Sequence, residues 1–369
     1  MREPRIGILG AGQLGLMLAQ AARDLDIGCR FYAETDDAPA ASLGPVITGA
    51  MDDDERLARF ADGLDVVTYE WENIPVLAAR RIDDTVPVRP GPRALEASQD
   101  RLAEKTFFVG QGQPTARFAA VDSQSDVKDA IEDLGFPLVL KTRRLGYDGK
   151  GQRMLRQPQD AGDAWQALGG RPLIAEQWVP FDRELSIIAV RGLDGSIACY
   201  PLIENSHADG ILRTSLTPAP KLAEQTQKAA ERCAIRVLTA LDYVGVLAIE
   251  LFDVAGQLLV NEMAPRVHNS GHLTIEGAVT SQFENHIRAI AGLPLGDTSI
   301  RGAAAMVNLI GNHPPPADLL AVKGARLHLY GKEPRPGRKL GHVTVCADTQ
   351  DQATGRQRQI QAIVAGGQQ

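Results

Sequence analysis

The chain has 369 residues, of which 44% are hydrophobic and 23% are charged, and its formal net charge is −7. This length exceeds the needs of one small core and predicts a globular protein of two or three domains. The acidic balance argues against nucleic acid as a partner, because a clustered basic face would be expected there, but it allows a local basic pocket for a small anionic substrate.

The cysteines and the apolar segments bear on where the protein works. Cys29, Cys199, Cys233 and Cys346 are far apart and follow no zinc-binding or CxxC spacing, which is typical of scattered thiols in a reducing cytosol. The N-terminus lacks the apolar stretch of a secretory signal, and no run of about eighteen apolar residues occurs. We expect a cytoplasmic protein with no membrane partner.

Strand and helix patterns alternate over the N-terminal part of the chain. The patterns predict, in chain order, a strand at 5–10, a helix at 13–26 that Gly28 stops, strands at 29–34 and 64–71, and a helix at 74–84. This alternation predicts an α/β unit, in which a parallel sheet has helices on its faces.

A proline- and glycine-rich stretch at 88–98 indicates a boundary, and a helix with Ser98 as its N-cap is predicted at 98–112. The later strands are predicted at 136–144, 152–156, 172–179, 184–192, 196–205, 244–253, 257–264, 303–311, 326–332 and 341–348. Between them lies a long helical pattern at 221–242, and a short helix is predicted near the C-terminal end.

A glycine motif follows the first predicted strand. Gly10, Gly12 and Gly15 form a GxGxxG pattern before a helix, and Glu34 ends the next strand. Read alone, the pattern favours a nicotinamide oxidoreductase, because it resembles a dinucleotide-binding turn with its ribose-binding acid. It requires only that backbone amides approach a phosphate closely, and tight packing of helix on strand explains it equally well.

A second glycine-rich loop, LGYDGKGQ at residues 145–152, joins two predicted strands. Such a loop lets backbone N–H groups fold over phosphates. Lys141, in the strand before it, is placed to add a cation at the same phosphates. The alternative is an exposed hairpin tip with a lysine that reaches solvent.

Two acids lie in the apolar strands of the hairpin predicted at 244–264. Glu250 and Glu262 occupy matching positions in these strands, where a carboxylate is costly unless it is paired or bound to a metal. Two such oxygen ligands suit Mg²⁺, which usually bridges to nucleotide phosphates. The alternative is that each acid faces solvent.

Taken in order, Lys141, GYDGKGQ, AEQWV, Glu250 and Asn261-Glu262 resemble the ATP-grasp superfamily. Within it, the chain resembles the 5-(carboxyamino)imidazole ribonucleotide synthetases, the ATPase subunits of phosphoribosylaminoimidazole carboxylase. The stretches that carry the resemblance are GAGQLGLM, TYEWENIP, SQDRLAEK, GYDGKGQ, NEMAPRVHNSGH and YGKEPRPGRKLGH, which together span residues 10 to 342.

The resemblance implies an ATP-grasp fold of three domains: a pre-ATP-grasp α/β domain at 1–97, an ATP-grasp α+β domain at 98–300 with a lid subdomain at 115–180, and a small β-rich C-terminal domain at 301–369. It also implies the reaction, in which bicarbonate is phosphorylated to carboxyphosphate and then carboxylates aminoimidazole ribonucleotide during purine biosynthesis. ATP and two Mg²⁺ ions are the implied cofactors. A homodimer, functionally coupled to the downstream mutase, is the implied assembly.

The resemblance further assigns ATP-binding residues. Contacts to the nucleotide are expected from Arg101, Lys141, Gly146, Tyr147, Asp148, Gly149, Lys150, Gly151, Gln152, Glu176, Gln177, Trp178, Val179, Glu184, His207, Asn261 and Glu262. Within this set, 176–179 would form the adenine-binding hinge, Glu184 would hold the ribose, and Glu250 and Glu262 would bind the metal.

The remaining assignments concern the other two substrates. Arg266, His268 and Asn269 would face bicarbonate and carboxyphosphate. Near the ribonucleotide the resemblance places Gln13, Leu14, Glu70, Glu72 and Arg335, and among the catalytic residues it places Lys332 and Arg338. Ordinary roles compete with several of these assignments, such as a solvated basic run at 335–339.

Two positions depart from the usual patterns, and other functions remain open. Ala264 stands where many ATP-grasp enzymes have a further metal-binding asparagine, and Val267 replaces the usual proline of PRPHNSGH. A formate-using or biotin-carboxylase-like ATP-grasp enzyme would differ at PRVHNSGH. A nicotinamide oxidoreductase would leave Glu250 and Glu262 unexplained, and a non-catalytic nucleotide sensor would share the whole fold.

Overall fold

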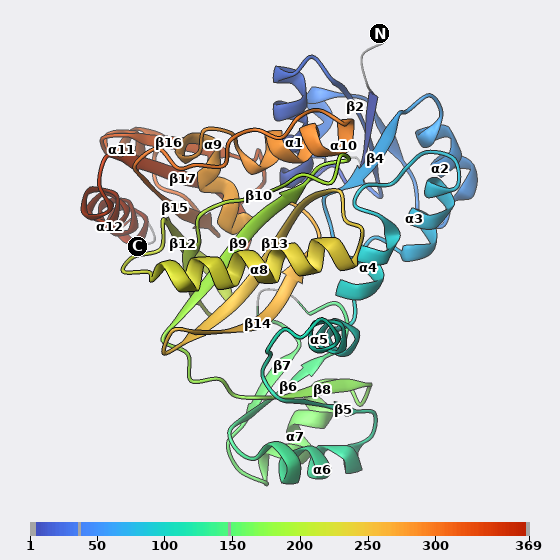
Figure 1. Cartoon of the computed structure of the whole chain (residues 1–369), viewed down its shortest axis with the longest axis vertical. Coiled ribbons are helices and arrows are strands. Elements are labelled where there is room, and N and C mark those ends of the chain that lie inside the picture. The colour runs from blue at the N-terminus through green and yellow to red at the C-terminus, as the bar shows by residue number, and fades with distance from the viewer. Residues whose placement is uncertain (1–4, 36–37, 147–148, 367–369) are drawn as a thin grey trace.

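The computed structural model describes residues 5–35, 38–146 and 149–366. These residues form three sheets (Figure 1): an N-terminal parallel sheet, a small antiparallel sheet at the bottom of the view, and a nine-stranded sheet that carries the rest of the chain. In the part of the chain that is described, no helix has both the length and the apolar character needed to cross a membrane.

The N-terminal sheet is parallel, as predicted, with the strand order β3-β2-β1-β4. Its elements are β1 (Arg5–Leu9), α1 (Gln13–Asp24), β2 (Gly28–Ala33), η1 (Pro39–Leu43), β3 (Val46–Thr48), α2 (Asp54–Ala61), β4 (Val66–Tyr69) and α3 (Val76–Asp83). The predicted role of Gly28 as a helix stop is wrong, because the helix already ends at Asp24 and Gly28 begins the next strand.

Two short helices, α4 (Pro92–Ser98) and α5 (Arg101–Gly110), lead out of this sheet. The prediction of Ser98 as the N-cap of the second helix is wrong, because Ser98 is the last residue of the first. The cap is Asp100, whose carboxylate accepts hydrogen bonds from the backbone N–H groups of Leu102 and Ala103. The aspartate satisfies donors that the first turn of a helix leaves unpaired.

The segment predicted as a lid, called the lid below, forms a four-stranded antiparallel sheet of order β5-β8-β6-β7, with α6 (Gln124–Leu134) and α7 (Asp160–Ala167) packed against it. Its strands are β5 (Phe118–Val121), β6 (Leu138–Thr142), β7 (Gln152–Leu155) and β8 (Leu173–Gln177). The lid has a hydrophobic core of its own, with Trp165 and Leu140 among its buried residues. The packing of this sheet and its two helices is therefore separate from that of the other two sheets.

The large sheet runs in the order β14-β13-β9-β11-β12-β15-β17-β16, and β10 pairs with β9 beside this path. Its strands are β9 (Arg183–Arg191), β10 (Ile197–Cys199), β11 (Ile203–Ala208), β12 (Ile211–Thr217), β13 (Gly245–Val254), β14 (Gln257–Ala264), β15 (Ala303–Ile310), β16 (Ala325–Leu329) and β17 (Lys339–Ala347). The three C-terminal strands therefore extend the central sheet instead of forming a sheet of their own.

Helices cover this sheet. They are α8 (Glu224–Ala240), the short η2 (Asn269–Leu273) and α9 (Thr274–Gly277), α10 (Gln282–Ala291), α11 (Pro316–Leu320) and α12 (Gln350–Gly366). Figure 1 shows α8 crossing the middle of the molecule above the lid, and α12 at the edge formed by the C-terminal strands. The predicted hairpin at 244–264 is confirmed, with a two-residue turn at Ala255 and Gly256, whose φ angles of 51° and 85° are both positive, as a type I′ turn requires.

Candidate active site

A cavity of about 730 Å³ lies between the lid sheet, the β13–β14 hairpin and the start of α1. Its apolar end is lined by Val139, Met154, Val179, Phe181 and Phe252, and the rings of the two phenylalanines are stacked with centroids 4.7 Å apart. Towards the N-terminal sheet the lining becomes charged. The cavity thus offers an apolar pocket for a flat ring at one end and a polar chamber at the other.

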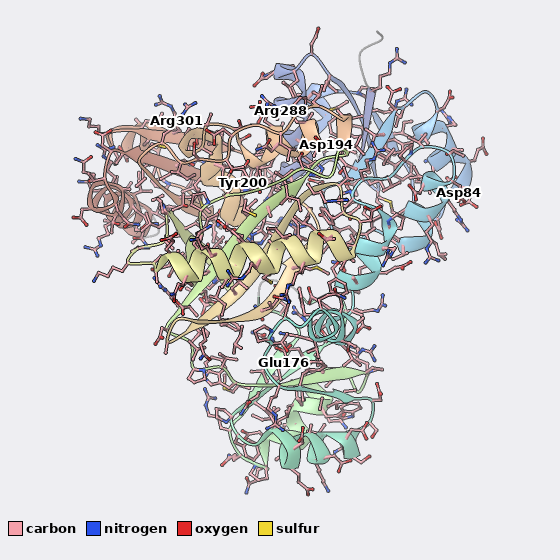
Figure 2. All side chains as sticks on the ribbon, viewed as in Figure 1. Asp84, Glu176, Asp194, Tyr200, Arg288 and Arg301 are labelled. Atoms are coloured by element: carbon pink, nitrogen blue, oxygen red, sulfur yellow. The ribbon has the colours of Figure 1, made fainter. Side chains whose placement is uncertain are left out.

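Two lysines share one carboxylate at the lid side of the cavity. The Oε2 atom of Glu176, in the lid (Figure 2), lies 3.0 Å from the Nζ of Lys141 and 3.3 Å from the Nζ of Lys105. Burial opposes the charged form of Glu176, but the two ammonium groups outweigh burial and lower its pKa to about 2. This cluster holds Lys141 in the polar chamber, and it makes Glu176 a lysine-binding residue.

The two acids of the hairpin face each other across β13 and β14. Glu250 and Glu262 are register partners, and both line the cavity. A guanidinium of Arg101 pairs with Glu262, and the Nε2 of His268 lies 3.3 Å from the Oε1 of Glu250. Burial and the charge of Glu262 raise the pKa of Glu250, whereas Arg101 overcomes the burial of Glu262 and lowers the pKa of that acid.

A local irregularity brings a third oxygen to the acid pair. The register shifts between Glu250 and Leu251, so that Asn261 is the extra residue beside Glu262 on β14. Asn261 lines the cavity, and its buried Oδ1 has no hydrogen-bond partner among the described residues. A buried amide oxygen without a donor is costly and suits a cation ligand.

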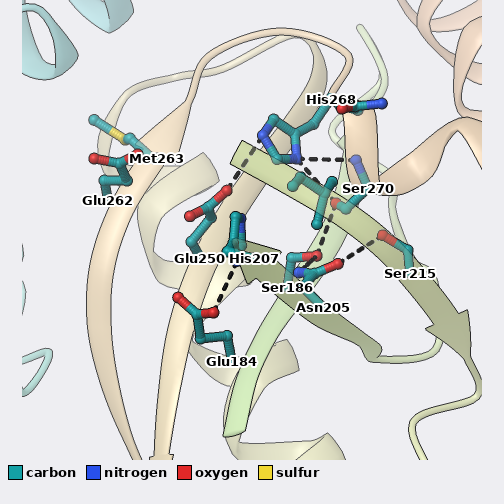
Figure 3. Close-up of polar contacts among 12 residues, drawn as sticks. Glu184, Ser186, Asn205, His207, Ser215, Glu250, Glu262, Met263, His268 and Ser270 are labelled. Carbon is teal, nitrogen blue, oxygen red and sulfur yellow. Dashed lines mark hydrogen bonds and ion pairs between the residues drawn. The ribbon is translucent and has the colours of Figure 1, made fainter. Parts of the chain in front are cut away.

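Glu184 and His207 lie side by side on β9 and β11 at the cavity wall (Figure 3). The Nδ1 of His207 and the Oε2 of Glu184 are 2.8 Å apart, and the register of β11 shifts at His207. Burial lowers the pKa of His207, but the neighbouring carboxylates raise it above its ordinary value overall. Both side chains line the cavity, where they could form hydrogen bonds with hydroxyl groups of a ligand.

At the charged end, Arg266 joins the hairpin to the N-terminal unit. Its guanidinium donates to the carboxylate of Glu72 and, through Nη1, to the carbonyl of Val267 at 2.9 Å. Burial opposes the protonated forms of Arg266 and His268 alike. The pKa of His268 is lowered to about 3, first by burial and then by Arg266, whereas Glu72 keeps the pKa of Arg266 above its ordinary value.

The N-terminal glycine motif binds a side chain of this protein. The backbone N–H groups of Gly12 and Gly15 both donate to the carboxylate of Glu70, with a distance of 2.6 Å from the Gly15 nitrogen. A Cβ atom on Gly10 or Gly12 would collide with that carboxylate. The amides that would hold a dinucleotide phosphate are therefore already used, and Glu34 is exposed, which removes the basis for a nicotinamide oxidoreductase.

Of the basic residues at 332–339, Lys332 and Lys339 lie closest to the cavity. Lys332 donates a hydrogen bond to the side chain of Gln13 at the start of α1. Arg335 is exposed, and Arg338 donates through Nη1 to the carbonyl of Glu333 at 3.2 Å. Lys339, at the start of β17, lines the cavity and was not among the predicted site residues.

Most of the predicted site residues meet at this one cavity. It is lined by Gln13, Leu14, Glu72, Arg101, Lys141, Gly146, Gly149, Lys150, Gln152, Glu176, Gln177, Trp178, Val179, Glu184, His207, Glu250, Asn261, Glu262, Arg266, His268 and Asn269. The predicted residues that do not line this cavity are Glu70, Gly151, Lys332, Arg335 and Arg338. Tyr147 and Asp148 lie outside the described residues.

Sequence reasoning missed Lys105, Lys339 and the stacked Phe181 and Phe252. Lys105 lies in α5 and its side chain is 1% exposed, because it is buried against Glu176. A charged residue on the buried face of a predicted helix was the available signal.

Comparison with known proteins agrees with this geometry. The ATP-grasp domain family matches residues 106–283, the ribonucleotide synthetase preATP-grasp domain matches 3–99, and the phosphoribosylaminoimidazole carboxylase C-terminal domain matches 304–356. The fold and the site thus define an ATP-grasp ligase with its preceding and following domains.

A curated relative from Pseudomonas aeruginosa, an N5-carboxyaminoimidazole ribonucleotide synthase, is 50% identical over 93% of this chain and 95% of its own length. The chain belongs to this synthase family. A synthetase structure from Thermus thermophilus has a TM-score of 0.94 at 54% identity, with 98% of each chain covered. A synthase from Aspergillus clavatus in complex with ADP and 5-aminoimidazole ribonucleotide has a TM-score of 0.92 at 31% identity, with 99% of each chain covered.

Proposed function

We propose that this chain carboxylates the amine of 5-aminoimidazole ribonucleotide with bicarbonate at the expense of ATP, giving N5-carboxyaminoimidazole ribonucleotide, ADP and phosphate in purine biosynthesis. The observation that carries the proposal is the continuity of the cavity. One space connects the apolar pocket at Phe181 and Phe252 to Lys141 and the acid pair, and then to Arg266 and Glu72 at the N-terminal unit. A nucleotide and a second substrate can therefore meet end to end.

ATP occupies the half of the cavity under the lid. The adenine lies between the apolar side chains of the lid and Phe252, and the ribose lies near Glu184 and His207. Lys141, Arg101 and the amides of the loop residues that line the cavity, which are Gly146, Gly149, Lys150 and Gln152, hold the phosphates. The side chain of Glu176 contributes indirectly, since it holds Lys141 at 3.0 Å. Because the side chain of Glu176 is occupied in this way, residues 176–179 bind the adenine through their backbone groups.

Magnesium fits the donor set that the hairpin presents. Glu250, Glu262 and the unpaired Oδ1 of Asn261 are oxygen ligands at the phosphate end of the cavity. Among the described residues, no three side chains of His, Cys, Asp or Glu converge as a metal site. Mg²⁺ usually takes one or two carboxylates and completes its shell with water and phosphate, so this set is sufficient. The metal would neutralise charge that develops on the phosphates.

The chemical step needs an oxygen of bicarbonate to become a leaving group. Bicarbonate attacks the γ-phosphorus of ATP, the bond to ADP breaks, and carboxyphosphate forms. Arg266 and Asn269 bind its oxygens, since both line the cavity beyond the acid pair. The glycine loop at 145–152 excludes water that would hydrolyse carboxyphosphate. The amine nitrogen then attacks the carboxyl carbon, the C–O bond to phosphate breaks, and the departing phosphate takes up the proton of the amine.

The ribonucleotide binds at the N-terminal side of the cavity. Gln13, Leu14 and Glu72 line that side, and Lys332 lies against Gln13. Arg335 and Arg338, farther out on the segment 331–338, attract its phosphate. We extend the proposal to a cytoplasmic homodimer coupled to the downstream mutase, which the family resemblance implies; light scattering of the purified protein tests the dimer.

The experiment that tests the function measures ADP release while each substrate is omitted in turn. We expect the fastest release when ATP, Mg²⁺, bicarbonate and 5-aminoimidazole ribonucleotide are all present. Stimulation by formate with glycinamide ribonucleotide, and none by the imidazole, would assign the chain to a formate-using ATP-grasp enzyme instead. Nucleotide binding without any ADP release would point to a sensor.

A further inference from the structure

A line of buried polar side chains runs away from the cavity, behind His268 (Figure 3). Its members are Ser270 on η2, Ser186 on β9, Asn205 on β11 and Ser215 on β12. The three serines are fully buried and Asn205 is 7% exposed. Buried hydroxyl and amide groups are costly unless every one is hydrogen-bonded, so the way these groups bond to one another is constrained.

The hydrogen bonds run in one direction along the line. The hydroxyl of Ser215 donates to the Oδ1 of Asn205 at 2.8 Å, and the Nδ2 of Asn205 donates to the Oγ of Ser186 at 3.0 Å. The hydroxyl of Ser186 then donates to the Oγ of Ser270 at 2.8 Å. Because a serine hydroxyl has a single proton, Ser270 can use its own proton only on the next group.

That next group is the ring of His268. The Oγ of Ser270 lies 2.9 Å from the Nδ1 of His268, and the backbone N–H of Ser270 also donates to Nδ1, at 3.3 Å. A backbone N–H has no acceptor role, so Nδ1 must be the accepting, unprotonated nitrogen. The ring proton is then on Nε2, which lies 3.3 Å from the Oε1 of Glu250 at the cavity.

We propose that Ser270, Ser186, Asn205 and Ser215 are positioning residues that hold His268 as the tautomer with its proton on Nε2. His268 therefore enters the reaction as a hydrogen-bond donor to a carboxylate or carboxyphosphate oxygen. It cannot accept the proton of the attacking amine, because the nitrogen that faces the cavity already carries one. This inference deepens the proposed function and rests on it for the identity of those oxygens.

The position of the line explains why it can orient the ring. Ser186 is the register partner of Glu250 on the neighbouring strand, so a residue that supports His268 and the carboxylate that faces His268 in the cavity come from two paired strands. Asn205 and Ser215 are register partners in the same way. A continuous chain of hydrogen bonds polarises each member, which strengthens the last bond to Nδ1.

The first experiment reads the tautomer directly, without any substrate. Protein labelled with ¹⁵N-histidine is examined by long-range proton–nitrogen correlation, and His268 is assigned among the seven histidines by its loss in His268→Gln. We expect the wild-type protein to show Nδ1 as an unprotonated nitrogen and Nε2 as a protonated one. A protonated Nδ1 in the wild-type protein overturns the proposal, even if every variant fails to fold.

The second experiment removes single hydroxyl groups from this line of hydrogen bonds. Ser270→Ala and Ser186→Ala are expected to increase the fraction of the other tautomer and to lower kcat for ADP formation about three- to tenfold, the range of one hydrogen bond, while KM for ATP changes less than about twofold. The control is Thr217→Val on β12, a buried hydroxyl that donates only to the carbonyls of Pro201 and Leu202. It is expected to change neither the tautomer nor kcat.

The outcomes separate the proposal from its rivals. If both serine variants lower thermal stability as Thr217→Val does, and leave the tautomer and kcat unchanged, the line is merely structural and the proposal is wrong. If the wild-type protein shows the expected tautomer but no ADP release with 5-aminoimidazole ribonucleotide, the proposed function fails while the orientation of His268 stands.

Discussion

Arg266 on the segment after β14 forms an ion pair with Glu72 on the segment after β4, so the β13–β14 hairpin is tied to the N-terminal unit across the cavity. The two side chains are 15% and 27% exposed, and both line the cavity. A buried arginine held by one carboxylate keeps donors for an incoming anion, because its planar fork has five N–H groups. In the proposed function, this pair would link the carboxyphosphate pocket to the ribonucleotide pocket.

The first prediction concerns this arginine. Arg266→Met keeps the apolar stem and removes the charge, and we expect nearly normal ATP binding with bicarbonate-dependent ADP formation reduced about a hundredfold or more. Calorimetry with nucleotide and steady-state ADP release measure the two quantities. Arg23→Met is the matched control, since Arg23 on α1 is 67% exposed and is not among the residues that line the cavity. Normal turnover in Arg266→Met would remove Arg266 from the mechanism.

The second prediction concerns the metal. Glu262→Gln removes one of the two facing carboxylates at constant size, so turnover should fall by orders of magnitude while the fold persists. ADP release over a range of Mg²⁺ concentrations measures the effect. Glu224→Gln serves as the control, because Glu224 pairs only with Lys228 on the exposed face of α8. Near-normal activity of Glu262→Gln would reduce Glu262 to a structural partner of Arg101.

The third prediction concerns the glycine loop. Gly149 and Gly151 both have a φ of +73°, and a Cβ on Gly151 would lie 2.5 Å from the Oγ1 of Thr142. Replacing both glycines with valine should therefore weaken ATP binding and turnover together. Gly355→Val, where a Cβ meets nothing within 4 Å, is the control for a surface glycine. Unchanged affinity and turnover in the double variant would make the loop a mere hairpin tip.

The fourth prediction concerns acid stability. His286 on α10 accepts from the N–H of Val246 at 3.1 Å and bonds to the hydroxyl of Thr68 at 2.8 Å, and burial lowers its pKa from 6.5 to about 3. Between these two values only the unfolded state binds the proton. The free energy of unfolding should therefore fall with falling pH, by up to about 1.4 kcal/mol per unit from this group.

His286→Gln removes the titrating group, so its stability should decline less steeply than that of the wild-type protein between pH 6 and pH 4. Urea unfolding at several pH values measures the two slopes, and groups shared by both proteins cancel in the comparison. Parallel slopes would mean that His286 is not the neutral, buried group described above.

Most of the strands and the chemistry-bearing segments were predictable because each has a local pattern, but the short strand β3 and the strands β5 and β12 were not predicted. Apolar runs marked the strands, and the matching positions of Glu250 and Glu262 in a hairpin were visible from its two-residue turn. The residue boundaries of the three domains remain predictions. Local signals were insufficient where a contact joins distant segments. Glu70 gave no sign that it would bind the amides of Gly12 and Gly15, and Lys105 looked like an ordinary helical residue.

The order of the strands in the large sheet could not be predicted from the sequence either. The hydrophobic run of β15 predicts a strand, but nothing in it specifies β12 as its neighbour. Long-range pairing is decided by packing of the whole sheet, which single-strand patterns do not contain. The prediction of the N-cap of α5 was wrong for a simpler reason. Serine and aspartate are both favoured at N-caps, and Ser98 is excluded only because it is the last residue of the preceding helix α4.

The continuous central sheet has a consequence for synthesis of the chain on the ribosome. One edge of β12 stays unpaired until β15 has been synthesised, because α8, the β13–β14 hairpin and α10 lie between the two strands in the chain. Until then a nascent chain displays an unpaired strand edge, a template for association with other chains. A message truncated before residue 303 would therefore yield an aggregation-prone fragment with the ATP-binding elements but without its last sheet partners.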